Sequence, residues 1–140
     1  MDSTTIYHNP KCSTSRNALA LIRHTGVEPQ IIEYLQSPPD RATLADLIKQ
    51  AGLTVRDALR DKGPEYAELG LGNPDLSDDQ LLDAMLAHPV LINRPFVVTP
   101  MGVRLGRPLE RVLEILPPIS GPFSKENGQM LINEQGQRVV

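Results

Sequence analysis

The sequence predicts an α/β protein with a mixed four-stranded sheet, flanked by helices and carrying a helical insertion. Three observations predict it. A strand–helix–strand pattern opens the chain, a run of capped helices fills the middle, and a hairpin followed by a helix occupies the last third. The compact first pattern implies a parallel strand pair with a right-handed crossover, whereas the hairpin adds antiparallel strands.

The first 34 residues supply the strand–helix–strand unit. Thr5-Ile6-Tyr7 is a short apolar strand, and residues 13–25 form an amphipathic helix that Gly26 should end in the left-handed conformation. Residues 30–34 then alternate as a second strand. The turn before the helix therefore lies at the carboxyl end of the first strand.

The middle of the chain reads as helical because capping residues precede apolar residues at helical spacing. Asp40 and Thr54 can each cap a helix, and Pro64 suits a first helical turn. Ser77-Asp78-Asp79-Gln80 is a capping box with acidic residues in the first turn, and Pro89 closes that segment.

The last third returns to strands. Residues 96–98 and 103–105 flank a turn and predict a hairpin, and Pro108 opens a helix that Pro117-Pro118 stops. A weaker hairpin signal pairs residues 130–132 with 138–140; the same stretch also fits a loosely ordered end. This order of elements is that of a thioredoxin-like fold. We expect a single domain over residues 1–140, with a helical insertion at about 40–88 and a tail at about 117–140.

Composition excludes several classes of function. The 140 residues carry a net charge of −3, so no electrostatic argument favours a nucleic acid or an anionic membrane as a partner. No apolar run is long enough to span a bilayer, and the first residues lack the pattern of a signal peptide. One cysteine allows no disulfide within the chain. We expect a cytoplasmic protein whose thiol stays reduced.

That cysteine, Cys12, is the first candidate for catalysis. It stands at the predicted strand-to-helix turn, where free N–H groups and the helix dipole favour a thiolate. Lys11, Arg16 and the hydroxyl residues that follow Cys12, among them Ser15, should lower its pKa further. The alternative is a small buried apolar side chain. Because Ser15 stands where a Cys-x-x-Cys motif has its second thiol, any redox cycle must finish with a thiol from another molecule.

Three arginines have a sequence context that singles them out: Arg60, Arg94 and Arg107. Arg94-Pro95 occupies the segment before the third strand, which in a thioredoxin-like sheet passes the nucleophile and often contains a cis proline. Several planar guanidinium groups together can hold a tetrahedral oxyanion. The alternative is that these three arginines are solvated surface residues. His8, four residues before Cys12, fits either a catalytic or a structural histidine. No spacing of ligands suggests a metal site.

At this point the chain resembles a known family, the glutaredoxin-coupled arsenate reductases. The resemblance extends over essentially the whole length. It rests on the residues from Tyr7 to Arg16 and on three further blocks: Arg56-Asp57-Ala58-Leu59-Arg60, His88-Pro89-Val90-Leu91-Ile92-Asn93-Arg94-Pro95, and Arg104-Leu105-Gly106-Arg107-Pro108.

The resemblance implies a mechanism. The Cys12 thiolate attacks pentavalent arsenic held by Arg60, Arg94 and Arg107, with His8 beside the nucleophile. Ser15, Arg16 and Pro95 support the loop. Glutathione, as co-substrate, then adds to the arsenic, and glutaredoxin completes the reduction and releases arsenite. The partners are thus arsenate, glutathione and glutaredoxin, with no bound cofactor.

Two other functions share this fold. Some relatives are transcriptional regulators that bind RNA polymerase and sense oxidants through Cys-x-x-Cys; Ser15 in place of the second cysteine counts against that function. Other relatives keep the cysteine without the full set of arginines, and by this resemblance a glutathione-dependent thiol reductase of another substrate is the further alternative. The presence of Arg60, Arg94 and Arg107 favours the arsenate reductase.

Overall fold

The computed structural model describes residues 3–119 and 121–139. The chain forms two compact units: Met1–Ile32 with Arg94–Val140, and Glu33–Asn93. The predicted insertion at 40–88 lies within the second unit, which extends past both ends of that range. At its far end, Asn93 N–H donates to the Ala58 carbonyl at 2.8 Å, which ties the segment after residue 88 to the helices.

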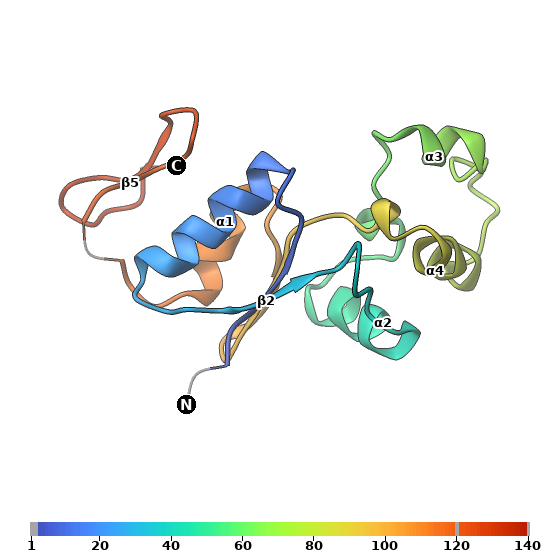
Figure 1. Ribbon diagram of the computed structural model, residues 1–140, viewed down its shortest axis with the longest axis horizontal. Coiled ribbons are helices and arrows are strands. Elements are labelled where there is room, and N and C mark those ends of the chain that lie inside the picture. The colour runs from blue at the N-terminus through green and yellow to red at the C-terminus, as the bar shows by residue number, and fades with distance from the viewer. Residues whose placement is uncertain (1–2, 120, 140) are drawn as a thin grey trace. The chain divides into compact units, whose positions relative to one another are not determined.

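The first unit is built on a mixed four-stranded sheet in the order β2-β1-β3-β4 (Figure 1). The strands are β1 (Thr5–His8), β2 (Gln30–Glu33), β3 (Phe96–Thr99) and β4 (Gly102–Leu105). β1 pairs antiparallel with β3, and β3 pairs antiparallel with β4. The predicted sheet and hairpin are confirmed, with the second strand one residue shorter than expected.

Helix α1 (Ser13–His24) packs its apolar face into the core of this unit. Thr25 caps its C-terminus, and Gly26 follows at φ 89°, the left-handed conformation expected there. Ala18, Leu21 and Ile22 are fully buried with Ile6 and Val97 of the sheet. The N-terminus of α1 is thereby fixed at the end of β1.

The helix after Pro108 is a 3₁₀ helix, η3 (Leu109–Ile115). Its buried residues Leu109, Val112 and Ile115 recur every third position, which is the period of a 3₁₀ helix, so they form one face. That face joins the same core as α1.

The tail adds a strand that the sequence did not indicate. β5 (Phe123–Ser124) pairs antiparallel with β6 (Met130–Ile132). The predicted pairing of β6 with the last residues is also present, since Ile132 bridges Arg138 and Val139 N–H donates to the Leu131 carbonyl at 2.9 Å; Val140 lies outside the described residues. Phe123, Leu131 and Ile132 are buried in the core, so residues 123–132, the C-terminal hairpin, belong to the folded unit.

The second unit is helical, and the predicted caps at Asp40 and Ser77 are present. Asp40 accepts from Thr43 N–H at 2.8 Å, and Ser77 and Gln80 form the capping box. Thr54, expected to cap the next helix, lies one residue before the N-cap Val55 of that helix, and the side chains of Thr54 and Asp57 accept from each other's backbone N–H groups. The helices are α2 (Arg41–Gln50), η1 (Arg56–Ala58), α3 (Pro64–Glu68), α4 (Asp78–Ala87) and η2 (Pro89–Leu91). Among the described residues, no helix has the length and apolar character needed to cross a membrane.

From the packing of the core of the first unit, we predict how much free energy of unfolding is lost when a large buried side chain is replaced by a small one. Leu21→Ala should destabilise the protein by about 2–5 kcal/mol, because the fully buried side chain leaves a cavity. Denaturant unfolding followed by circular dichroism measures this loss. Leu69→Ala is the matched control: Leu69 is 46% exposed, so about 0.5 kcal/mol or less is expected. Equal losses for the two variants would contradict the assignment of this core.

Candidate active site

The loop that carries Cys12 is a turn closed by hydrogen bonds to Asn9. Cys12 N–H donates to the Asn9 carbonyl at 3.0 Å, and Lys11 N–H donates to Asn9 Oδ1 at 3.0 Å. Cys12 is the N-cap residue of α1, with extended backbone angles, and its carbonyl accepts from Arg16 N–H at 3.0 Å. The thiol thus stands at the predicted strand-to-helix turn. Asn9 was not among the expected site residues, although Asn-Pro is a known turn signal.

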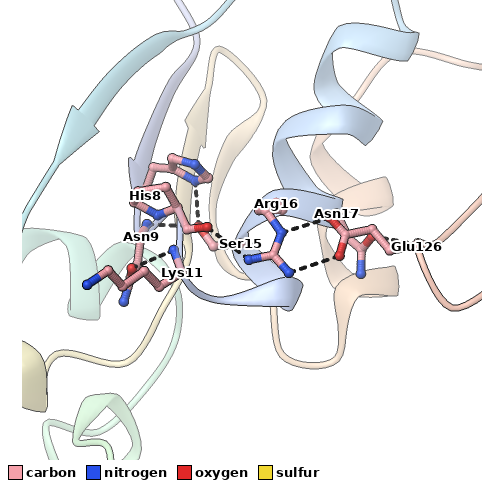
Figure 2. Close-up of polar contacts among 8 residues, drawn as sticks. His8, Asn9, Lys11, Ser15, Arg16, Asn17 and Glu126 are labelled. Carbon is pink, nitrogen blue, oxygen red and sulfur yellow. Dashed lines mark hydrogen bonds and ion pairs between the residues drawn. The ribbon is translucent and has the colours of Figure 1, made fainter.

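Ser15 connects this loop to His8. The Ser15 side chain is fully buried, and its Oγ lies 2.7 Å from His8 Nδ1 while accepting from Asn9 N–H at 3.0 Å (Figure 2). A hydroxyl that already accepts one N–H can donate to Nδ1, which then leaves the imidazole proton on Nε2. Ser15 therefore orients the imidazole of His8, which is itself buried. A direct catalytic role for His8 stays a prediction.

Arg107 joins the thiol to the segment before β3. Its Nη2 donates to Cys12 Sγ at 3.5 Å, and its Nε donates to the Arg94 carbonyl at 2.8 Å. The Arg94–Pro95 bond is cis, as expected at this place in the fold, and the Arg107–Pro108 bond is cis as well. Arg94 is buried, and its guanidinium also hydrogen-bonds to the Cys12 sulfur. Two of the three predicted arginines thus meet the nucleophile.

Gly106 permits this arrangement by leaving room for Pro95. A Cβ at residue 106 would lie 3.2 Å from Pro95 Cγ and 3.1 Å from Val112 Cγ2, closer than ordinary contacts allow. Gly106 N–H also donates to the Pro95 carbonyl at 2.9 Å. Glycine at this position brings the end of β4 against the segment before β3, and so places Arg107 beside Arg94.

Opposing effects set the pKa of the Cys12 thiol, and the net result is a pKa below the ordinary value. Partial burial raises the pKa, since it disfavours the charged form. The backbone N–H of Ser15, the hydrogen bond from Arg94 and the positive charges of Arg107 and Arg94 together lower it by more. The sequence named Lys11 and Arg16 as the cations that lower the pKa, and Arg94 and Arg107 as part of an oxyanion clamp at the nucleophile; in the structure Arg94 and Arg107, more than 80 residues away, are the arginines that lower the pKa of Cys12.

The guanidinium of Arg16 lies instead against the C-terminal hairpin. Its Nε and Nη2 donate to the two carboxylate oxygens of Glu126 at 2.8 and 3.0 Å, while Nη1 donates to the Pro10 carbonyl at 2.9 Å (Figure 2). Arg16 therefore contacts the loop at Pro10 and also binds a partner 110 positions away, and its supporting role in catalysis stays a prediction. No local sequence signal could have identified Glu126.

Arg60 belongs to the helical unit. Its backbone N–H donates to the Leu91 carbonyl at 2.7 Å, beside a bridge between Leu59 and Ile92. The segment of Arg60 is thus tied to the strand-like segment that ends just before Arg94 in the sequence. Its membership of the same arginine cluster stays a prediction. Within residues 3–119 and 121–139, no three His, Cys, Asp or Glu side chains gather where they could hold a metal ion.

Comparison with known proteins identifies the family. The sequence model of the ArsC family matches residues 7–115. The chain belongs to the ArsC family. It is 60% identical over 139 residues, covering 99% of both chains, to the arsenate reductase of Rhizobium meliloti strain 1021. It is 54% identical over 140 residues, again 99% of both, to the arsenate reductase of Escherichia coli K12.

A solved structure agrees with this assignment. The arsenate reductase from Vibrio cholerae superposes with a TM-score of 0.78 at 52% identity, over 81% of this chain and 98% of that one. The resemblance recognised in the sequence and the thioredoxin-like fold that it implied are confirmed. The ArsC match ends at residue 115, so the C-terminal hairpin that Arg16 contacts lies beyond the part that the family model describes.

The electrostatics of Cys12 predict a reactive thiolate near neutral pH. The rate of alkylation by iodoacetamide, measured against pH, should rise with an apparent pKa below the value of about 8.5 of free cysteine. Arg107→Ala should move that pKa upward, because a positive charge in contact with the sulfur is lost. Arg111→Ala, an exposed arginine on η3, is the control and should leave the profile unchanged. A wild-type profile like that of free cysteine would refute the assignment.

Proposed function

We propose that this chain reduces arsenate to arsenite through a covalent adduct of arsenic with Cys12, using glutathione and glutaredoxin as reductants. The observation that carries the proposal is a thiol of lowered pKa in contact with two arginines, in a chain 60% identical to a protein named arsenate reductase. Arsenate is a tetrahedral oxyanion, and guanidinium groups bind such anions through paired hydrogen bonds.

In the first step, the Cys12 sulfur attacks the pentavalent arsenic. An As–S bond forms, an As–O bond breaks, and the departing oxygen leaves as water after taking up protons. Arg94 and Arg107 neutralise the negative charge of the oxyanion, which would otherwise repel a thiolate. Arg60 is proposed as the third arginine of this clamp, and His8 as a positioned group beside the loop.

The remaining steps supply two electrons. The thiol of glutathione replaces a second oxygen on arsenic, which leaves as water. A thiolate of glutaredoxin then attacks the glutathione sulfur, so that an S–S bond forms and the As–S bond breaks with its electron pair left on arsenic. Water displaces Cys12 from the trivalent arsenic and releases arsenite. Overall, arsenate and two thiols give arsenite, one disulfide and water.

The single cysteine is the reason that both reductants come from outside the chain. Without a second thiol, Cys12 cannot form an internal disulfide, so the electrons must arrive from other molecules. Both electrons come from thiols, and the proposal includes no bound cofactor, nucleic acid or membrane. We place the reaction in the cytoplasm, where thiols are kept reduced.

The arginine clamp predicts the effect of three substitutions. Arg60→Ala, Arg94→Ala and Arg107→Ala should each lower kcat/KM for arsenate by roughly tenfold to a hundredfold, since a charge-assisted hydrogen bond contributes about 1.5–3 kcal/mol. Lysine at each position should restore only part of the activity, because it keeps the charge and loses the planar fork.

Thermal unfolding of the same variants separates binding from stability. The fall in activity should exceed what any shift in Tm explains. Arg111→Ala again serves as the control and should retain full activity. Near-complete activity in all three clamp variants would mean that these arginines are surface charges and that the clamp does not exist.

The route of the electrons predicts a covalent intermediate. Given arsenate and glutathione without glutaredoxin, the wild-type protein should accumulate an adduct on Cys12, visible by intact mass spectrometry, and glutaredoxin should clear it. Cys12→Ser should form no adduct and no arsenite while keeping the fold, because a serine hydroxyl is far less nucleophilic at neutral pH.

The same assay identifies a different class of enzyme. A protein that reduces arsenate with a dithiol thioredoxin, and does not respond to glutathione or glutaredoxin, would refute the proposed reductants. A protein with no arsenate turnover that binds RNA polymerase would refute the proposed reaction as a whole.

A further inference from the structure

A cavity of about 160 Å³ shares Arg107 with the proposed clamp, and its other lining residues have no role in the mechanism above. Its lining is formed by Thr14, Asn17, Arg107, Pro108, Leu109 and Lys125. Arg107 belongs both to this lining and to the contact with Cys12 Sγ, at 3.5 Å. A molecule seated in the cavity would therefore contact the same arginine side chain that contacts the thiol.

The chemistry of the lining favours an anion. Arg107 and Lys125 contribute positive charge, and no acidic residue is part of the lining. Lys125 Nζ donates to Gln129 Oε1 at 3.1 Å and forms an ion pair with Glu110 Oε1 at 3.9 Å, a distance longer than a hydrogen bond. The Lys125 side chain is only 19% exposed, so its charge is less screened by water than that of a surface lysine.

Lys125 reaches this place because the C-terminal hairpin contacts α1 at two points, of which Figure 2 shows the one at Arg16. Near the start of the helix, Arg16 pairs with Glu126, and Glu126 N–H donates to Asn17 Oδ1 at 2.9 Å. At the other end, the ring of Phe123 packs on the ring of His24 with centroids 5.4 Å apart. The residue next to Lys125 is thus fixed through both its backbone and its side chain.

We propose that this cavity is the subsite for a carboxylate of glutathione, bound by Lys125 together with Arg107. The inference rests on the proposed use of glutathione. Glutathione carries its thiol between two ends that each bear a carboxylate, so one end can occupy the cavity while the thiol faces Cys12. Pockets that enclose whole drug-sized ligands measure about 300–1,000 Å³, so this cavity fits one end of the tripeptide and leaves the rest outside.

The subsite gives Arg16 and Glu126 a function as positioning residues. Their ion pair does not touch the substrate; it holds the hairpin so that Lys125 lines the cavity. Arg16, four positions after Cys12, thereby links the loop of the nucleophile to the site that binds the co-substrate.

The decisive experiment compares two thiols in the arsenate reduction assay. Lys125→Met keeps most of the aliphatic length and removes the charge. The KM for glutathione should rise about threefold to tenfold, with kcat and the KM for arsenate unchanged. Turnover with 2-mercaptoethanol, a thiol without a carboxylate, should be the same in the variant and the wild type. Lys49→Met, on the exposed surface of α2, is the matched control and should change none of these values.

A second variant tests the docking of the hairpin. Glu126→Gln removes the ion pair with Arg16 but keeps the backbone donor to Asn17. The KM for glutathione should rise by a smaller factor than in Lys125→Met, again without a change in turnover with 2-mercaptoethanol. An equal loss with both thiols would indicate a merely structural role and would overturn this part of the inference.

Failure of the subsite and failure of the proposed function give different results. If the wild type uses glutathione and Lys125→Met has the same KM for it, the subsite is wrong and the function stands. A rise in the KM for arsenate would assign the cavity to the oxyanion clamp and also overturn the subsite. If the wild type shows no turnover with glutathione, titration of the Cys12→Ser protein with S-methylglutathione decides by NMR. Shifts of the Asn17 and Lys125 amides support the subsite, and unchanged amides refute it.

Discussion

The contact of Arg107 with both Cys12 and Arg94 is the interaction on which the site depends. One guanidinium donates to the Cys12 sulfur at 3.5 Å and to the Arg94 carbonyl at 2.8 Å, so it fixes the thiol relative to the segment that carries the second arginine. Gly106 allows the close packing against Pro95 that brings these segments together. If this contact is lost, the thiol no longer has the positive charge of Arg107 beside it, and the Arg94 carbonyl loses its hydrogen bond from Arg107.

The reactivity of Cys12 is a balance of burial against charge. Burial alone would raise the pKa of the thiol and leave it protonated. The Ser15 backbone N–H and the two arginines reverse that effect, so a partly buried sulfur can still be a thiolate. Burial then has an advantage, because charges interact more strongly where water is displaced. The same site can therefore hold an oxyanion and a thiolate at close range.

The C-terminal hairpin shows how a tail becomes part of a site. Its apolar residues Phe123, Leu131 and Ile132 are buried in the core, so the hairpin is anchored by the hydrophobic effect. The Arg16–Glu126 pair is exposed and contributes little to stability by itself, but it selects where the hairpin turn lies. The stability of the hairpin thus comes from its apolar residues, and the position of its turn on α1 comes from Glu126.

The order of elements, the caps of α2 and α4 and the place of Cys12 could be predicted from the sequence, because these depend on neighbouring residues. Asp40, Ser77 and Gly26 act within one turn of their own helix, and a thiol after a strand and before a helix is placed by the chain itself. Arg94 and Arg107 were expected near the thiol from their place in the fold and from the family resemblance, but their contacts with the sulfur and the direction of the Arg16 side chain depend on tertiary packing. Arg107 and Glu126 stand 95 and 110 positions from their partners, and side chains so distant in sequence meet only through the packing of the core.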